Sequence, residues 1–169
     1  PGYPVLPRES VYLAIPPNAK FSSLEIEYVN VEYLQGKYNL PYTPAPTPLN
    51  NADVKIPVKT FAENEFYPST PIRYIREGYL RDYKVVILDY YPFMYNPITK
   101  TLAVYKEVRF KLYYDVTPKK YPKSFKWTIF DELAKILIDN YEQAINWKAK
   151  IIRPTSRKPG VLLPSGSYD

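Results

Sequence analysis

Hydrophobic and polar residues alternate along much of this chain with the two-residue period of a β-strand. The alternation is clearest in residues 108–114, where Val108, Phe110, Leu112 and Tyr114 are separated by Arg109, Lys111 and Tyr113. That pattern predicts a strand with one buried and one wet face. Residues 83–91 are apolar on both faces, which predicts a strand at the centre of its sheet. Shorter apolar runs predict further strands at residues 11–15, 54–58, 72–75 and 102–105.

A longer strand is expected at residues 24–34, with an irregularity in the middle. Its apolar positions are even-numbered as far as Tyr28 and odd-numbered from Val29 onward. Such a change of face predicts a β-bulge near Tyr28. Residues 95–100, which contain Asn96 and Pro97, predict a turn between two strands. Six to eight short strands joined by turns are typical of an antiparallel β-sandwich or a jelly-roll-like fold.

After Pro122 the period changes to that of a helix, which is expected at about residues 128–150. Thr128 or Asp131 can cap its first turn. The predicted apolar face, which we expect to pack against the edge of the sandwich or to contact another domain, consists of Leu133, Ile136, Leu137, Asn140, Tyr141, Ala144 and Ile145.

Proline-rich segments interrupt this pattern at three places. The first seven residues and residues 38–53 are predicted to be extended, because proline fixes φ and lacks an N–H group. Residues 153–169 hold three more prolines and show no periodicity. We therefore expect a β-sandwich domain over residues 1–150, with its edge helix, followed by a linker over residues 151–169.

The composition removes most kinds of catalytic chemistry. The chain has no cysteine and no histidine, which excludes cysteine nucleophiles, Ser-His-Asp triads, disulfides and nearly every zinc site within it. We expect no enzyme activity of its own and no cofactor or metal. The formal net charge of +6 is spread along the chain without an arginine-rich patch, so nucleic acid is not an expected partner. Lysine, tyrosine and isoleucine in place of thermolabile residues weakly favour a heat-adapted source.

Several short patterns occur in a fixed order along the chain. The patterns are Gly2-x-Pro4-x-Leu6-Pro7, Phe66-Tyr67-Pro68, Leu80-Arg81-Asp82, Tyr95-Asn96-Pro97-Ile98-Thr99-Lys100-Thr101-Leu102, and Phe130-Asp131-Glu132 followed by Asn140-Tyr141-Glu142. Together they resemble the propeptide domain of gingipain-type (family C25) cysteine peptidases. The resemblance covers residues 2–142, and the chain also ends on Ser167-Tyr168-Asp169, which is similar to the start of that family's catalytic domain.

The resemblance implies a prodomain of a secreted zymogen. Such a domain assists folding of the C-terminal catalytic domain of the same precursor and covers its Cys/His site until proteolysis removes it. That catalytic domain is the expected partner. The chain begins at Pro1 without methionine, so a signal peptide is expected upstream, and no apolar run is long enough to span a membrane.

In this family an extended loop offers a basic residue to the specificity pocket of the peptidase. The corresponding segment here, residues 38–53, contains neither arginine nor lysine. The resemblance therefore leaves Leu40, Pro41, Asn50 and Asn51 as candidate inhibitory residues, and an ordinary stiff surface loop remains the alternative. Possible processing sites in the linker are Arg153, Arg157 and Lys158, which can equally be solvated linker charges.

Two other classes of function stay open from the sequence. A carbohydrate-binding or adhesion module could use some of the 19 tyrosines as a flat platform for sugar rings. A peptidase based on carboxylates would draw on Asp89, Glu63 and Glu65, although no Asp-Thr/Ser-Gly signature is present.

Overall fold

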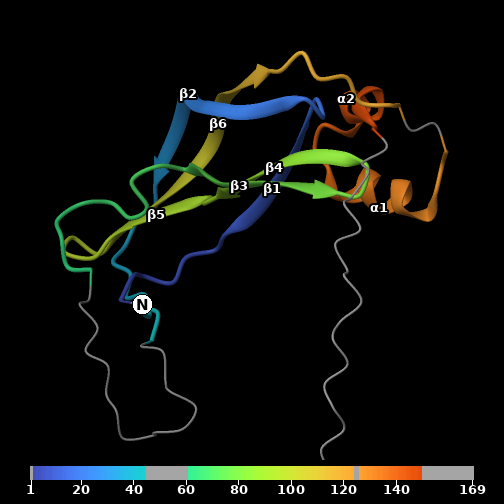
Figure 1. The fold of residues 1–169 in the computed structure, drawn as a ribbon. Coiled ribbons are helices and arrows are strands. Elements are labelled where there is room, and N and C mark those ends of the chain that lie inside the picture. The colour runs from blue at the N-terminus through green and yellow to red at the C-terminus, as the bar shows by residue number, and fades with distance from the viewer. Residues whose placement is uncertain (1, 45–60, 124–125, 150–169) are drawn as a thin grey trace, which may run out of the picture.

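The computed structural model describes residues 2–44, 61–123 and 126–149, whose strands form two antiparallel sheets packed face to face (Figure 1). The first sheet has the order β1-β4-β3 and the second the order β2-β6-β5. This confirms the predicted mainly-β antiparallel sandwich; the strand expected at residues 54–58 lies outside the described residues. The strands are β1 (Glu9–Ile15), β2 (Ala19–Tyr33), β3 (Ile72–Leu80), β4 (Tyr83–Tyr90), β5 (Phe93–Asn96) and β6 (Thr101–Val116).

Strand β4 is the central strand of the first sheet, as its apolar sequence predicts. It pairs with β1 on one side and with β3 on the other. Val86 and Leu88 are fully buried between the two sheets, whereas Tyr83 and Val85 are buried on the opposite face of the same strand. Both faces of β4 are therefore covered, which explains the absence of polar alternation in this segment.

β-Bulges in the pairing of β2 with β6 explain why the hydrophobic pattern of these strands changes face. The pairing of β2 with β6 shifts between Ile26 and Tyr28, which confirms the predicted bulge. Another shift lies at Lys106 of β6. Asn30 pairs with Glu107 and the next residue, Val31, pairs with Tyr105, so Lys106 is the extra residue. The runs at residues 102–105 and 108–114 are thus one continuous strand, because the extra residue absorbs the change of face.

The expected turn between β5 and β6 is also present. The side chain of Asn96 accepts hydrogen bonds from the backbone N–H groups of Ile98 (3.0 Å) and Thr99 (3.1 Å). An asparagine that closes a turn on the backbone in this way fixes the register of the hairpin. This function of Asn96 is structural.

The sandwich core fills the space between β1-β4-β3 and the long strands of the second sheet. Ile15, Ile72 and Leu88 are buried there, and Ile26 and Phe110 pack against them from β2 and β6. The remaining members of this cluster are Ala19, Val86, Val11, Leu13, Phe21, Leu24, Tyr74, Leu112 and Tyr114.

A helical layer covers the outer face of the first sheet. It consists of α1 (Ile129–Leu137), α2 (Tyr141–Ala144) and the 3-10 turn η1 (Ile145–Trp147), shown in orange to red in Figure 1. Ala134, Ile138 and Ala144 are buried against Ala14, Tyr83 and Val85 of the sheet.

The single helix predicted over residues 128–150 is wrong in its length and in its buried face. The chain leaves the helical conformation at Ile138, and the predicted apolar side chains Leu133, Ile136 and Leu137 are exposed. The small side chain of Ala134 lets α1 approach the sheet closely, so the buried stripe is the one with the smaller residues.

The helix breaks because two polar side chains bind the open edge of β1. Asp139 accepts a hydrogen bond from Tyr12 N (2.9 Å), and Asn140 accepts one from Ala14 N (2.7 Å). Asn140 also donates to Ala14 O (3.0 Å), and Asp139 N donates to Tyr12 O (3.0 Å). These bonds satisfy the backbone groups that an edge strand otherwise leaves unpaired.

Asp131 is a buried carboxylate that connects the start of α1 to the sheet and to the end of the domain. Its side chain is 1% exposed, and it accepts hydrogen bonds from Tyr83 Oη (2.7 Å) and from Thr128 N (2.6 Å). Lys148 Nζ lies 2.7 Å from Asp131 Oδ1 and also donates to Lys126 O (2.7 Å). Thr128 is therefore the N-cap of α1, which is one of the two residues that the sequence predicted for this position.

The electrostatics of this cluster follow from those contacts. Burial alone raises the pKa of Asp131, but the hydrogen bonds from Lys148, Tyr83 and Thr128 outweigh it and lower the pKa to about 2. Burial, then the hydrogen bonds with Tyr141 and Asp131, raises the pKa of Tyr83. Tyr83 consequently remains a proton donor to the carboxylate at neutral pH.

We expect Asp131→Asn to lower the free energy of unfolding by about 3–5 kcal/mol, because it leaves the ammonium of Lys148 buried without its counter-ion. Urea denaturation at neutral pH measures the change. Asp115→Asn on the exposed end of β6 is the matched control, and we expect it to change stability by less than about 0.5 kcal/mol.

The ion pair between Asp131 and Lys148 also predicts that the free energy of unfolding depends on pH. Since the folded-state pKa of Asp131 is below its ordinary value of 3.8, its stabilisation is present above about pH 4 and is lost as the pH falls through about 2. The shift of nearly two units corresponds to about 2 kcal/mol. The stability difference between the wild type and Asp131→Asn should narrow by that amount between about pH 5 and pH 2; a constant difference would contradict the assignment.

Candidate functional site

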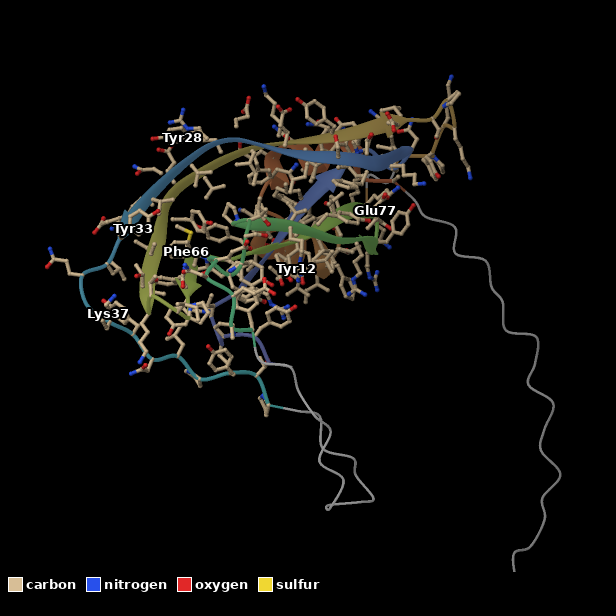
Figure 2. The ribbon with its side chains drawn as sticks, turned by 90° about the vertical axis from the view of Figure 1, so that its left-hand side faces the viewer. Tyr12, Tyr28, Tyr33, Lys37, Phe66 and Glu77 are labelled. Atoms are coloured by element: carbon tan, nitrogen blue, oxygen red, sulfur yellow. The ribbon has the colours of Figure 1, made fainter. Side chains whose placement is uncertain are left out.

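The segment that follows β2 is fastened to the turn between β5 and β6. Lys37 Nζ donates a hydrogen bond to Thr99 O (2.7 Å), and Tyr38 N donates to Lys100 O (2.9 Å). The hydroxyl of Tyr95 donates to Tyr38 O (2.8 Å). Figure 2 shows Lys37 at the end of the molecule away from Glu77. The start of the proline-rich segment therefore has a fixed position.

The N-terminal residues bind the described chain on both sides of residues 45–60, just before residue 45 and just after residue 60. Gly2 N donates to Thr43 O (2.9 Å), and Phe61 N donates to Gly2 O (2.7 Å). Thr43 N returns a bond to Tyr3 O (2.9 Å), so a short antiparallel ladder forms. Gly2 has a φ of 81°, which is a left-handed conformation that a side chain disfavours. One glycine thus links the residues on both sides of the segment.

Three aromatic rings surround this linkage. The ring centroid of Tyr3 lies 4.8 Å from that of Tyr67 and 5.7 Å from that of Phe61. Phe61 and Tyr67 also contact each other, at 5.6 Å. Tyr67 pairs through its backbone with Tyr95 of β5, so the ring cluster is attached to the second sheet. We call Gly2, Tyr3, Thr43, Phe61 and Tyr67 the loop base.

Burial is the main cause that raises the pKa of Tyr67. The Tyr67 side chain is therefore neutral at physiological pH, and the loop base combines ring contacts with the backbone hydrogen bonds of Gly2 and Thr43.

Two of the four candidate inhibitory residues lie in the described part of the chain. Leu40 is half-buried, and Pro41 O accepts a hydrogen bond from Val5 N (2.8 Å). The candidates Asn50 and Asn51 lie outside the described residues, as do the proposed processing sites Arg153, Arg157 and Lys158. What the arrangement can do is hold the chain at Thr43 and at Phe61 close together, which reduces the entropy that the intervening segment loses on binding.

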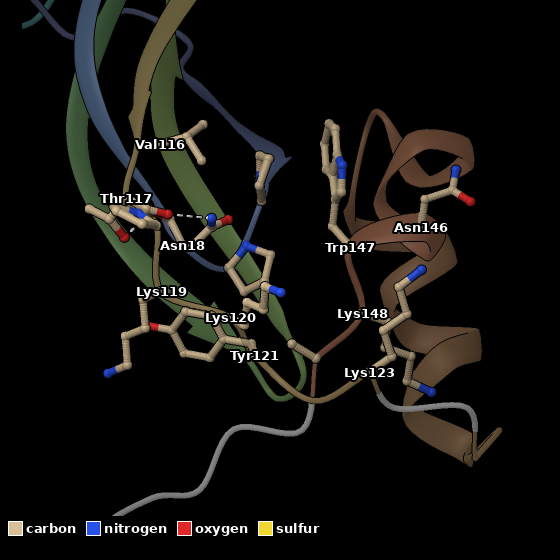
Figure 3. Close-up of a pocket in the computed structure, with 14 residues that line it drawn as sticks. Asn18, Val116, Thr117, Lys119, Lys120, Tyr121, Lys123, Asn146, Trp147 and Lys148 are labelled. Atoms are coloured by element: carbon tan, nitrogen blue, oxygen red, sulfur yellow. Dashed lines mark hydrogen bonds between the residues drawn. The ribbon is translucent and has the colours of Figure 1, made fainter.

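A groove of about 690 Å³ lies at the opposite end of the molecule, between the end of β6 and η1 (Figure 3). Its apolar lining includes Pro16, Tyr121 and Trp147, and its rim carries Lys119 and Lys120. The described residues that line it include four lysines and the hydroxyl side chains of Thr117 and Tyr121, but no carboxylate and no serine. The groove can contact another molecule.

The carboxylates considered as peptidase residues form no catalytic pair. Asp89 is buried and lies 3.2 Å from the guanidinium of Arg8 and 3.3 Å from that of Arg73. Glu63 and Glu65 are exposed in a loop. Asp89 is thus neutralised by two arginines, which is the pattern of a structural ion pair.

Three of the exposed tyrosines, Tyr28, Tyr33 and Tyr113, each contact a different neighbouring side chain. Tyr28 lies under the guanidinium of Arg109, and the hydroxyl of Tyr113 donates to Glu25 (2.8 Å). Tyr33 packs edge-on against Phe66. Among the described residues, no stack of parallel rings connects these exposed tyrosines.

Within the described ranges, no group of three or more acidic, cysteine or histidine residues could hold a metal ion. None of the helices in the same part of the chain is long and apolar enough to cross a membrane.

The C25 propeptide family model (Propeptide_C25) matches residues 1–149. The chain belongs to that family. The propeptide is 30% identical to Gingipain R1 of Porphyromonas gingivalis over 111 residues, which cover 63% of this chain and 11% of the relative. It is 28% identical to Gingipain R2 of the same species over 112 residues, which cover 63% and 15%. The propeptide therefore spans only a small part of the length of these relatives.

Two solved structures share the fold. The propeptide is similar to a chain in the complex of Porphyromonas gingivalis RgpB pro- and mature domains, with a TM-score of 0.53, 26% identity and coverage of 83% of this chain and 73% of that one. It is also similar to a chain from a structure on the zymogenic latency of gingipain K, with a TM-score of 0.52, 15% identity and coverage of 69% and 68%. The second likeness concerns the fold alone.

Sequence reasoning found the proline-rich segment but missed the residues that hold it. The functions of Gly2, Phe61 and Tyr67 depend on contacts between distant parts of the chain. The available signal is local: Gly2 stands among three prolines, and Tyr67 belongs to one of the motifs of the family.

We expect Phe61→Ala to loosen the loop base. The loss of two ring contacts, at about 0.5–1.5 kcal/mol each, should speed hydrogen exchange at the backbone amides of Thr43 and Phe61 by about 5- to 100-fold. Exchange measured by NMR tests this. Tyr79→Ala, at a half-exposed ring of β3, is the control and should leave both amides unchanged. Equal exchange in wild type and Phe61→Ala would show that the rings do not hold the segment.

Proposed function

We propose that this propeptide is the chaperone and inhibitor of a cysteine peptidase encoded in the same secreted precursor. In this proposal the domain covers the Cys/His active site until proteolysis removes it. The loop base is the observation that carries the proposal, because it fixes both flanks of a proline-rich segment on one glycine. The membership of the C25 propeptide family supports it, as does the likeness to a chain in a complex of pro- and mature domains.

The inhibitory step is binding without cleavage. A segment whose ends are already joined at Gly2 loses less conformational freedom when it enters a cleft than a free peptide does. Proline adds to this because its φ is fixed before binding. Leu40 and Pro41 belong to the fastened flank, so we propose that they support the segment while Asn50 or Asn51 enters the specificity pocket.

Removal of the domain requires a cut in the precursor. We propose that Arg153, Arg157 and Lys158 are the processing sites, since they follow the last described residue, Ala149, in the sequence. A trypsin-like or self-cleaving activity would recognise these basic residues.

The decisive experiment mixes the purified propeptide with the separately produced peptidase domain. We expect a stable complex and a loss of peptidase activity that is saturable with propeptide concentration. Replacing residues 45–60 by an equal length of Gly/Ser should weaken inhibition at least tenfold. Lys111→Gln, on the exposed face of β6, is the control and should inhibit as the wild type does.

If no complex forms and activity is unchanged, the proposed function is wrong. Full inhibition by the Gly/Ser variant would refute only the inhibitory role of the segment.

The chaperone role predicts a separate outcome. Denatured peptidase domain should regain at least several-fold more activity when refolded in the presence of the propeptide, which is then removed by proteolysis. Serum albumin at the same concentration is the control for nonspecific protection, and an equal yield in both samples would contradict the role.

A further inference from the structure

Helix α1 presents a large apolar surface on the side that faces away from the sheet. Ile129 is 76% exposed, Leu133 is 49% exposed and Ile136 is 81% exposed. At 100° per residue these three side chains lie opposite Asp131, Ala134 and Ile138, which face the sheet. Phe130 and Leu137, at 39% and 43% exposure, flank them. We call Ile129, Phe130, Leu133, Ile136 and Leu137 the outer α1 face.

Exposure of these apolar side chains to water is energetically unfavourable. A surface helix normally turns its apolar stripe toward the core, but the largest apolar side chains of α1 face away from the sheet. The pattern of large residues in the sequence also predicts that Leu133, Ile136 and Leu137 are the buried ones. The outer α1 face therefore has the composition of an interface.

The size of the face limits what can cover it. A helix of nine residues is about 13 Å long, whereas a stable interface buries about 800 Å² on each partner. Two copies of the propeptide joined through α1 alone would bury too little area. A face of this size can be one part of a larger interface, or it can bind a partner that a covalent connection already holds nearby.

The charges around the face argue against a membrane. Helices that lie on membranes carry several Lys or Arg residues on their polar side. Lys135 of α1 and Arg81, whose guanidinium lies 3.4 Å over the ring of Phe130, are the basic groups at this face. They are offset by Glu132 in α1 and by Asp139 and Glu142 just after it. This balance gives no attraction to anionic lipid.

The described domain ends within the same helical layer. Ala149 N donates to Asp82 O (3.0 Å), and Ala149 pairs with Lys123 directly after η1. Figure 1 shows α1 and α2 side by side at this end of the sandwich. In the proposed precursor, a peptidase domain connected to Ala149 through residues 150–169 is held near α1 at a high effective concentration.

We propose that the outer α1 face docks into an apolar surface of the peptidase domain of the same precursor, away from its active site. This inference rests on the proposed function and adds a second attachment to it. The loop base presents the inhibitory segment at one end of the sandwich, and the outer α1 face anchors the other end. Ile136 and Leu133 are the central contacts.

The test is Ile136→Lys in the full chain, with affinity for the separately produced peptidase domain measured by titration calorimetry. A charge in the centre of an apolar contact should weaken binding by at least about 30-fold, as at other hot spots. The matched control is Tyr79→Lys, which adds the same charge at an exposed ring of β3, and Ile136→Val should bind as the wild type does. Because Ile136 is exposed, the thermal midpoint of the isolated chain should shift by less than about 2 °C.

The outcomes separate the two proposals. If the wild type does not bind the peptidase domain, the proposed function itself fails. If the wild type binds and Ile136→Lys binds equally well, only the docking of α1 is refuted. It is also refuted if Ile136→Lys abolishes self-association in ultracentrifugation while peptidase binding is unchanged, or if it lowers the thermal midpoint by many degrees.

Discussion

The buried carboxylate of Asp131 holds the three parts of this domain together. It caps α1 through Thr128, contacts the sheet through Tyr83 and forms an ion pair with Lys148 near the end of the described chain. Each of these partners comes from a different element, so the helical layer cannot separate from the sheet without leaving a buried charge unpaired. Asp131 thereby fixes the start of α1 and the residue that follows η1, while Asp139 and Asn140 fix the segment before α2 on β1.

The sequence predicted the parts of the fold that depend on local signals. The two apolar faces of β4, the bulge near Tyr28 and the turn at Asn96 each follow from a few neighbouring residues. The break in the helix could not be predicted in this way, because its cause is the binding of Asp139 and Asn140 to β1, more than 120 positions away in the chain.

The prediction of which face of α1 is buried was wrong for a related reason. Hydrophobic periodicity selects the side with the largest apolar residues, and here close packing selects the side with Ala134. The same limit applies to the candidate site. The proline pattern identified the segment, but the contacts of Gly2 with Thr43 and Phe61 exist only in the folded chain. The error about α1 is informative, because a prediction of burial that the isolated domain does not satisfy points to a missing partner.

The proposed function requires the domain to remain rigid between its two contact regions. The continuous strands β2 and β6 provide this rigidity, since their paired length runs from the groove end toward the loop base (Figure 1). Asp131 fixes the helical layer at one end, and the ring cluster of Tyr3, Phe61 and Tyr67 fixes the segment at the other.

The position of Lys148 has a consequence for the cleavage that we propose. The ion pair with Asp131 and the backbone bond of Ala149 complete the described structure, so a cut anywhere beyond Ala149 removes none of these contacts. Under the proposed function, a released propeptide would therefore keep the Asp131–Lys148 pair and could bind the peptidase again. The peptidase would become permanently active only after the propeptide had diffused away or been degraded.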